Sequence, residues 1–225
     1  GKECRELFRV AEDNVLVGID VSGLELRCLA HFMARYDKGS YIREVLDGDI
    51  HTANQKAAGL ETRAQAKTFI YALIYGCGGV KMGQILGKDA KAGKKIIKEF
   101  ISKTPALKRL MTDVQEKAQQ GFIKGLDGRL LKIRSEHKAL NTLLQSAGAL
   151  ICKQWIIELH RLAKNISFKQ VAWIHDEIQL ETRKEYADDL GKFGTQAIKK
   201  AGQFFGIRTQ LDCEWKLGET WKDTH

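Results

Sequence analysis

The stretch VLVGID, residues 15–20, decides the fold, because it is a run of β-branched and apolar residues that ends in an acid. A short run of this kind predicts a central buried strand. After Gly23 the apolar residues change to helical spacing, which predicts an amphipathic helix to about Tyr36. Asp20 is therefore expected at the end of a strand that crosses the core.

Two further strands are predicted around an acidic turn. β-prone residues occupy Val171–Ile174 and Glu177–Leu180, and the dipeptide His175-Asp176 separates them. Two short strands joined by two residues are typical of an antiparallel hairpin. Asp176 is therefore expected at the tip of that hairpin.

Most of the remaining chain has a helical pattern. Helices are predicted over residues 51–76, 81–108, 141–162 and 184–205. Thr104-Pro105 marks a break, after which another helix is predicted to about residue 120. A turn is predicted at 126–129 and a final strand at 208–215. Strands and helices are mixed without regular alternation, which favours an α+β fold with an antiparallel sheet.

Composition narrows the class of protein. The chain has 225 residues, of which 44% are apolar and 29% charged, so it is expected to be globular, as one large domain or two small ones. Its apolar runs are too short to cross a membrane, and the charged first residues are unlike a signal peptide, so we expect a cytoplasmic protein. The net charge of +9 favours a polyanionic partner. The five cysteines are widely spaced, which argues against disulfides and a zinc site.

Asp20 and Asp176 are the first candidates for chemistry. Either carboxylate alone is more typical of a strand cap or a surface residue. Two carboxylates on neighbouring strands of one sheet can, however, share a pair of magnesium ions, which prefer oxygen ligands. Such a metal pair stabilises the attacking and leaving oxygens of a phosphoryl transfer.

Arg63, Lys67 and Tyr71 follow one another at intervals of four residues on a predicted helix. A guanidinium, an ammonium and an aromatic ring in a row suit a nucleoside triphosphate, whereas the alternative is an exposed helix face. The lysines of the segment 81–108 leave a similar choice between a solvated face and one that follows a phosphate backbone.

Four segments then carry a family resemblance. Residues 20–27 (DVSGLELR) resemble motif A of the family A DNA polymerases, and the Ser-Gly-Leu form is similar to replicative polymerases of podovirus-type phages. Residues 63–76 resemble motif B, residues 175–177 (HDE) motif C, and residues 141–145 (NTLLQ) a further segment near the template. The resemblance runs over nearly the whole chain and implies the C-terminal palm and fingers: palm at 1–50, fingers at 51–125 and palm again at 126–225.

The resemblance implies a role for each matching residue. Asp20, Asp176 and the carbonyl of Val21 would hold two Mg²⁺ ions, with Mn²⁺ as a substitute. Glu177 would be an auxiliary acid, and Lys67 a general acid toward pyrophosphate. The nucleotide-binding residues would be Glu25, His51, Arg63, Lys67, Tyr71 and Tyr75. The residues that contact template or primer would be Arg129, Asn141, Gln145 and His175.

Two of these residues would also set substrate selectivity. Glu25 would lie beneath the sugar and exclude a 2′-hydroxyl. Tyr71 would stack beside the nucleotide, and a tyrosine there implies tolerance of dideoxynucleotides. Tyr75 would cap the template side of the new base pair.

The implied partners are primer–template DNA and deoxynucleoside triphosphates. The thumb and exonuclease of the family have no counterpart in these residues, so we expect a split or truncated polymerase whose thumb and first palm segment come from a separate chain, or a homo-oligomer joined through an exposed apolar sheet edge. The alternatives are an inactive nucleic-acid-binding remnant, a single-subunit RNA polymerase and a phosphodiesterase.

Overall fold

The computed structural model describes residues 2–225 and divides into two compact units. The sheet unit comprises the residues up to Leu24 together with Gly148–His225, and the helical unit comprises Glu25–Ala147. The sequence-based palm and fingers boundaries, at residues 50 and 125, both fall inside the helical unit. One reason is that Tyr36 of α1 (Leu24–Asp37) hydrogen-bonds Asp113 of α7 (Pro105–Ala118), which ties the first helix to the later ones.

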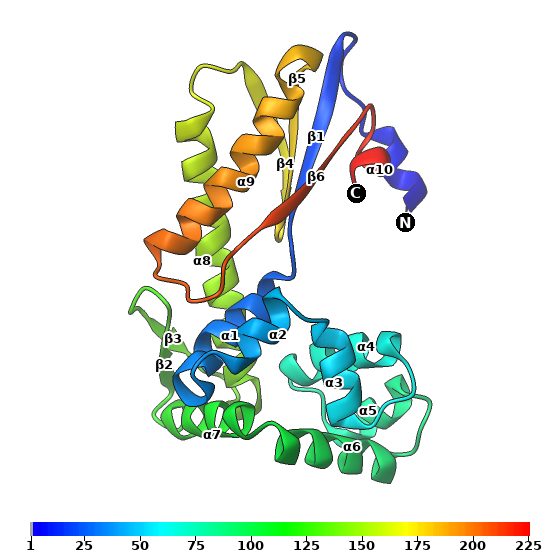
Figure 1. Ribbon diagram of the computed structural model, residues 1–225, viewed down its shortest axis with the longest axis vertical. Coiled ribbons are helices and arrows are strands. Elements are labelled where there is room, and N and C mark those ends of the chain that lie inside the picture. The colour runs from blue at the N-terminus through cyan, green and yellow to red at the C-terminus, as the bar shows by residue number, and fades with distance from the viewer. Residues whose placement is uncertain (1) are drawn as a thin grey trace. The chain divides into compact units, whose positions relative to one another are not determined.

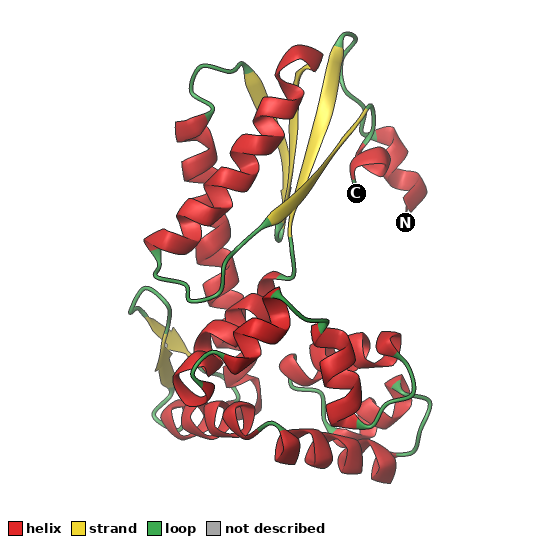
Figure 2. Cartoon of the chain, in the orientation of Figure 1, coloured by secondary structure: helices red, strands yellow, loops and turns green. Residues whose placement is uncertain are grey.

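A four-stranded antiparallel sheet forms the centre of the sheet unit (Figures 1 and 2). Its order is β4-β5-β1-β6, with the strands β1 (Asn14–Val21), β4 (Phe168–Ile174), β5 (Glu177–Arg183) and β6 (Cys213–Gly218). β1 lies between β5 and β6, as its buried apolar residues predict. This confirms the α+β class and the antiparallel sheet.

Helices lie on both faces of this sheet. On one face, α9 (Ala187–Phe204) approaches so closely that a Cβ on Gly194 would lie 2.5 Å from Ile19. Trp155 of α8 (Ala139–Leu162) is fully buried and donates its Nε1–H to the Gly194 carbonyl at 2.8 Å, which joins the two helices. On the other face, a Cβ on Gly18 would lie 2.6 Å from Thr224 of α10 (Trp221–Thr224). Adjacent residues of a strand point to opposite faces of the sheet. Ile19 therefore faces α9, and its neighbour Gly18 faces α10.

The helical unit contains the other helices and one small hairpin (Figure 1). Besides most of α1 and α7 it contains α2 (Ser40–Leu46), α3 (Ile50–Ala58), α4 (Arg63–Ile74), α5 (Gly79–Ile85), α6 (Ala90–Lys103), β2 (Phe122–Lys124), β3 (Leu130–Lys132) and the first turns of α8. Short 3-10 turns complete the chain at Lys2–Leu7, Glu136–Lys138 and Lys184–Tyr186. Phe69 of α4 and Phe100 of α6 are fully buried and stack edge to face, with ring centroids 5.0 Å apart.

The structure corrects three element boundaries. The expected helix over 51–76 is two helices, because Gly59 adopts φ 64° and ends α3 while a capping box of Thr62 and Gln65 begins α4. The segment 81–108 is divided by Gly87, at φ 66°, and by the N-cap Asp89 of α6. The last strand lies at Cys213–Gly218 rather than at 208–215, because pairing with β1 sets its register. Among residues 2–225, no helix is long and apolar enough to cross a membrane.

Candidate active site

An acidic row crosses the sheet unit at the end of β1. Asp20 is the one exposed residue between the buried Ile19 and Val21. Glu177 of β5 and Glu214 of β6 are its two cross-strand partners. Cross-strand partners share a face of the sheet, so three carboxylates lie side by side there. Glu214 was not expected from the sequence, because only strand register places it beside Asp20.

Asp176 is anchored to the same place through the backbone. The Val21 N–H donates to the Asp176 carbonyl at 3.0 Å, so the hairpin turn and the end of β1 are held together. His175 precedes it with φ 56°, a left-handed conformation that suits the first position of a tight two-residue turn. Trp173 Nε1–H donates to the His175 carbonyl at 2.8 Å and fixes the turn further. The structure therefore brings together Asp20, Val21, His175, Asp176 and Glu177.

The row has an excess of negative charge. Burial, together with the negative charges of the neighbouring Asp176 and Glu177, raises the pKa of Asp20 to about 6. A bound cation would offset both effects, and carboxylate oxygens with a nearby carbonyl are the donor set that Mg²⁺ prefers. Among residues 2–225, no group of three or more His, Cys, Asp or Glu side chains is arranged to hold a metal ion. Magnesium usually takes only one or two carboxylates from the protein, so the residues fit the ion.

Glu177 is held inside the protein. Its side chain is only 4% exposed, and its Oε1 accepts hydrogen bonds from Gln179 Nε2 and Trp221 Nε1, both at 2.6 Å. Its Oε2 lies 2.5 Å from Nδ1 of His225. Both oxygens are therefore engaged with β5 and the α10 region. Trp221 and His225 gave no local sequence signal, since they reach Glu177 only through the close packing of α10 on Gly18.

In the helical unit, α4 presents a polar face. Arg63 and Lys67 are exposed and Tyr71 is half-buried. The opposite face is buried and consists of Ala66, Phe69, Ile70, Leu73 and Ile74. The spacing of four residues thus places the predicted phosphate-binding cations on one side of a well-capped helix, as the sequence indicates.

His51 joins this face from α3. Its ring centroid lies 6.4 Å from that of Tyr71. Burial lowers the pKa of His51, and the positive charges of Arg63 and Lys67 lower it further. Its Nδ1 is buried and has no hydrogen-bond partner among residues 2–225. The two helices therefore gather three nitrogen-bearing side chains that favour an anion.

Glu25, Tyr75 and Gln145 form a second cluster in the helical unit. The Tyr75 hydroxyl donates to Glu25 Oε1 at 3.3 Å and accepts from Gln145 Nε2 at 3.1 Å. These residues belong to α1, to the C-cap of α4 and to α8. Three residues assigned to the sugar, the base pair and the template are thereby joined into one chain of hydrogen bonds.

Arg129 and Asn141 lie apart from that cluster. Arg129 is on the turn between β2 and β3, where its Nε–H donates to Asp127 at 2.6 Å. The side-chain oxygen of Asn141 is buried and has no partner among the described residues.

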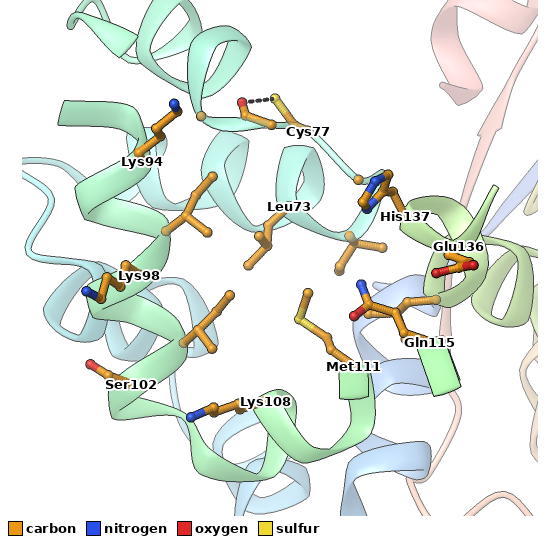
Figure 3. A pocket seen from close by; sticks show the side chains of 17 residues that line it. Leu73, Cys77, Lys94, Lys98, Ser102, Lys108, Met111, Gln115, Glu136 and His137 are labelled. Carbon is orange, nitrogen blue, oxygen red and sulfur yellow. Dashed lines mark hydrogen bonds between the residues drawn. The ribbon is translucent and has the colours of Figure 1, made fainter. Parts of the chain in front are cut away.

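A cavity of about 720 Å³ lies between the C-terminal end of α4 and the helices α6 and α7 (Figure 3). Its floor is apolar, and lysines of α6 and α7 lie at its rim: Lys94, Lys98 and Lys108. None of the residues predicted for metal, nucleotide or DNA contacts lines it.

Comparison of the sequence with known proteins identifies its family. The family model for DNA polymerase family A matches residues 1–223. The chain belongs to DNA polymerase family A. This confirms the resemblance drawn from the four sequence motifs.

The similar proteins divide into phage and bacterial groups. The chain is 45% identical to a DNA-directed DNA polymerase of Enterobacteria phage T3 and 44% identical to that of Escherichia phage T7, in each case over the whole chain and 36% of the relative. It is 27% identical to DNA polymerase I of Bacillus caldotenax, over 99% of the chain and 28% of that protein. The phage proteins are the more similar, as the Ser-Gly-Leu form of motif A indicated. The chain spans about a third of the length of the curated relatives it matches.

Proposed function

We propose that this chain carries the nucleotidyl-transfer site of a DNA-directed DNA polymerase, which joins a deoxynucleotide to a primer 3′-hydroxyl. The observation that carries the proposal is the acidic row, in which Asp20 stands beside Glu177 and the Val21 N–H holds the turn of Asp176 at 3.0 Å. Family A polymerases generally use divalent metal ions, and the carboxylates of Asp20 and Asp176 are oxygen ligands of the kind that Mg²⁺ prefers.

The carboxylates of Asp20 and Asp176, with the carbonyl of Val21, would hold two Mg²⁺ ions. When bound, the ions lower the pKa of the primer hydroxyl and stabilise the leaving pyrophosphate. Glu177 supports the turn rather than binding an ion, because its two oxygens already contact Gln179, Trp221 and His225.

The polar face of α4 supplies the contacts to the triphosphate. Arg63 and Lys67 bind its oxygens together with His51, and Lys67 would give a proton to the departing pyrophosphate. Tyr71 stacks beside the sugar and base.

Sugar selection follows from the hydrogen-bonded cluster. The Tyr75 hydroxyl donates a hydrogen bond to the Glu25 carboxylate, which supports a fixed carboxylate that would exclude a 2′-hydroxyl. Gln145, Asn141, Arg129 and His175 contact the template and primer. A preference for deoxynucleotides over ribonucleotides separates this proposal from an RNA polymerase.

A second polypeptide would complete the enzyme. The edge strand β4 leaves Val171 51% and Trp173 42% exposed. Apolar side chains on the edge strand of a sheet are a pairing surface. We assign this edge to a separate thumb-bearing chain or to a second copy.

Primer extension tests the proposal. The chain is incubated with a primed template, Mg²⁺ and deoxynucleotides and compared with Asp176→Asn, for which we expect a loss of at least about 100-fold. The control Asp13→Asn neutralises an acid of the same unit in a left-handed turn that asparagine tolerates, and it should leave extension unchanged. DNA binding without extension by the folded wild type would instead favour a nucleic-acid-binding remnant.

A further inference from the structure

Asp49 links the first turns of α3 and α4. As the N-cap of α3, its Oδ1 accepts from the backbone N–H groups of His51 at 3.1 Å and Thr52 at 3.3 Å. Its Oδ2 accepts from the Thr52 hydroxyl at 2.8 Å and from Arg63 Nε at 2.7 Å. One carboxylate is therefore fixed by a helix terminus and in turn fixes an arginine on the next helix.

Asp49 contacts Arg63 at Nε, which leaves the two terminal nitrogens of the guanidinium for a ligand. Among residues 2–225, the only hydrogen bond of this guanidinium uses Nε. The two terminal nitrogens carry four more N–H donors in a planar fork that matches two oxygens of a phosphate. The side chain of Arg63 is 57% exposed, so that fork faces solvent rather than the core.

We propose that Asp49 is a positioning residue that holds Arg63 by Nε and so presents its terminal nitrogens to the nucleoside triphosphate. The inference rests on the proposed function, because it takes Arg63 as a ligand of the triphosphate. It adds a residue that neither the motifs nor the family match assigns.

The contact is not required to begin either helix. α4 starts with its own capping box of Thr62 and Gln65, and α3 is capped through the other oxygen of Asp49. An exposed ion pair contributes little to folding stability. Arginine, however, loses much rotamer freedom when it binds a ligand, and a side chain already held at Nε loses less of it on binding.

Asp49 also couples Arg63 to His51. The two residues stand at the first turns of neighbouring helices, and Asp49 contacts both, through the His51 backbone N–H and the Arg63 side chain. The positive charge of Arg63 also lowers the pKa of His51, so the two side chains lie within electrostatic range of each other. The negative charge of Asp49 opposes the triphosphate, so the benefit of positioning has to exceed that repulsion.

Asp49→Asn separates the two roles of this residue. Asparagine is as good an N-cap as aspartate, so its side-chain oxygen can keep the bonds to His51 and Thr52. Its amide nitrogen then faces Arg63 Nε, donor against donor, and the link is lost. Thr52→Val is the matched control, since it removes another bond to the same Oδ2 but leaves Arg63 in place.

A double-mutant cycle of Asp49→Asn and Arg63→Gln tests the inference. The readout is the Kd of a deoxynucleoside triphosphate and, in parallel, of inorganic tripolyphosphate, each with Mg²⁺. We expect Asp49→Asn to raise both Kd values about three-fold in the wild type and to change neither in the Arg63→Gln background. Thr52→Val should be neutral, and the melting temperature of Asp49→Asn should match the wild type.

An equal effect of Asp49→Asn in both backgrounds would overturn the inference, because it would then act without Arg63. Tighter binding by Asp49→Asn would also overturn it, since Asp49 would then compete with the phosphate. Primer extension by the wild type separates these outcomes from a failure of the proposed function. A folded wild type that binds neither probe overturns both.

Discussion

At the scale of single residues, the fold shifts the pKa values of Asp20 and His51 so that the charged form of each is disfavoured. Asp20 ends a buried strand between two other carboxylates, and the fold therefore favours its protonated form in the absence of a cation. His51 lies between two cations, and the fold favours its neutral form. A bound cation would stabilise the ionised Asp20, and a bound anion would stabilise the protonated His51. Shifted pKa values of this kind are typical of binding sites.

Asp20→Asn should stabilise the metal-free protein at high pH only. The pKa of Asp20 rises from 3.8 to about 6 on folding, so the folded state binds more protons between these values and its stability falls as the pH rises through them. With EDTA at pH 8, the variant should melt about 2–4 °C above the wild type, a value reduced for partial exposure. At pH 3.5 the difference should vanish. Differential scanning calorimetry measures both, with Glu12→Gln as an exposed control; a pH-independent difference would contradict the titration.

His51 should make triphosphate binding tighter as the pH falls. Its pKa is lowered in the free protein, and a bound polyanion would raise it, so binding takes up protons below the ordinary value of 6.5. The Kd of the wild type should therefore fall more steeply toward pH 5.5 than that of His51→Gln. Isothermal titration in two buffers of different ionisation enthalpy measures the proton uptake directly, and parallel pH profiles for the two proteins would refute it.

At the scale of elements, close backbone approach brings distant residues to the site. Gly18 has no Cβ to hold α10 away from β1, so Trp221 and His225 reach the Glu177 carboxylate. Glu177 adjoins Asp176, and the hairpin that carries Asp176 is therefore supported by the α10 region, more than forty residues further along the chain.

A pair of tryptophan substitutions measures that support. Trp221→Phe keeps the ring but leaves a buried carboxylate oxygen with one donor fewer, so it should reduce the free energy of unfolding by about 1–3 kcal/mol. Trp173→Phe removes the same kind of bond to an accessible carbonyl and should cost about 1 kcal/mol or less. Urea denaturation compares the two, and equal losses would show that Glu177 gains nothing special from Trp221.

At the scale of the whole molecule, net charge and an exposed sheet edge are the two features that bear on binding partners. Its net charge of +9 suits a polyanion, and its sheet has an apolar edge at β4. β4 has an exposed Lys169 and a register shift between Gln170 and Ala172, yet it leaves Val171 and Trp173 exposed.

Val171→Lys should therefore prevent self-association of the isolated chain. We expect the wild type to form dimers or larger species at tens of micromolar, roughly the range of weak edge pairing. Val80 is exposed to a similar degree, 56% against 51%, but lies on a helix, so Val80→Lys should leave association unchanged. Light scattering after size exclusion measures the mass, and a monodisperse wild-type monomer would contradict the assignment of this edge.

Local pattern was sufficient for much of this protein. The apolar run before Asp20, the acidic turn at Asp176 and the four-residue spacing from Arg63 to Tyr71 each follow from short-range periodicity, and they led to the α+β class and to the family. These features are encoded within a few residues of one another, which is why the sequence by itself determined them.

Other features were decided only by tertiary structure. The register of β6 places Glu214 beside Asp20, the packing of α10 on Gly18 brings Trp221 and His225 to Glu177, and the Asp49 carboxylate reaches Arg63 across a helix connection. Each joins residues far apart in the chain, and no local periodicity records which of them will meet. Their meeting depends on the free energy of packing the whole unit, so it appears only when the chain is folded.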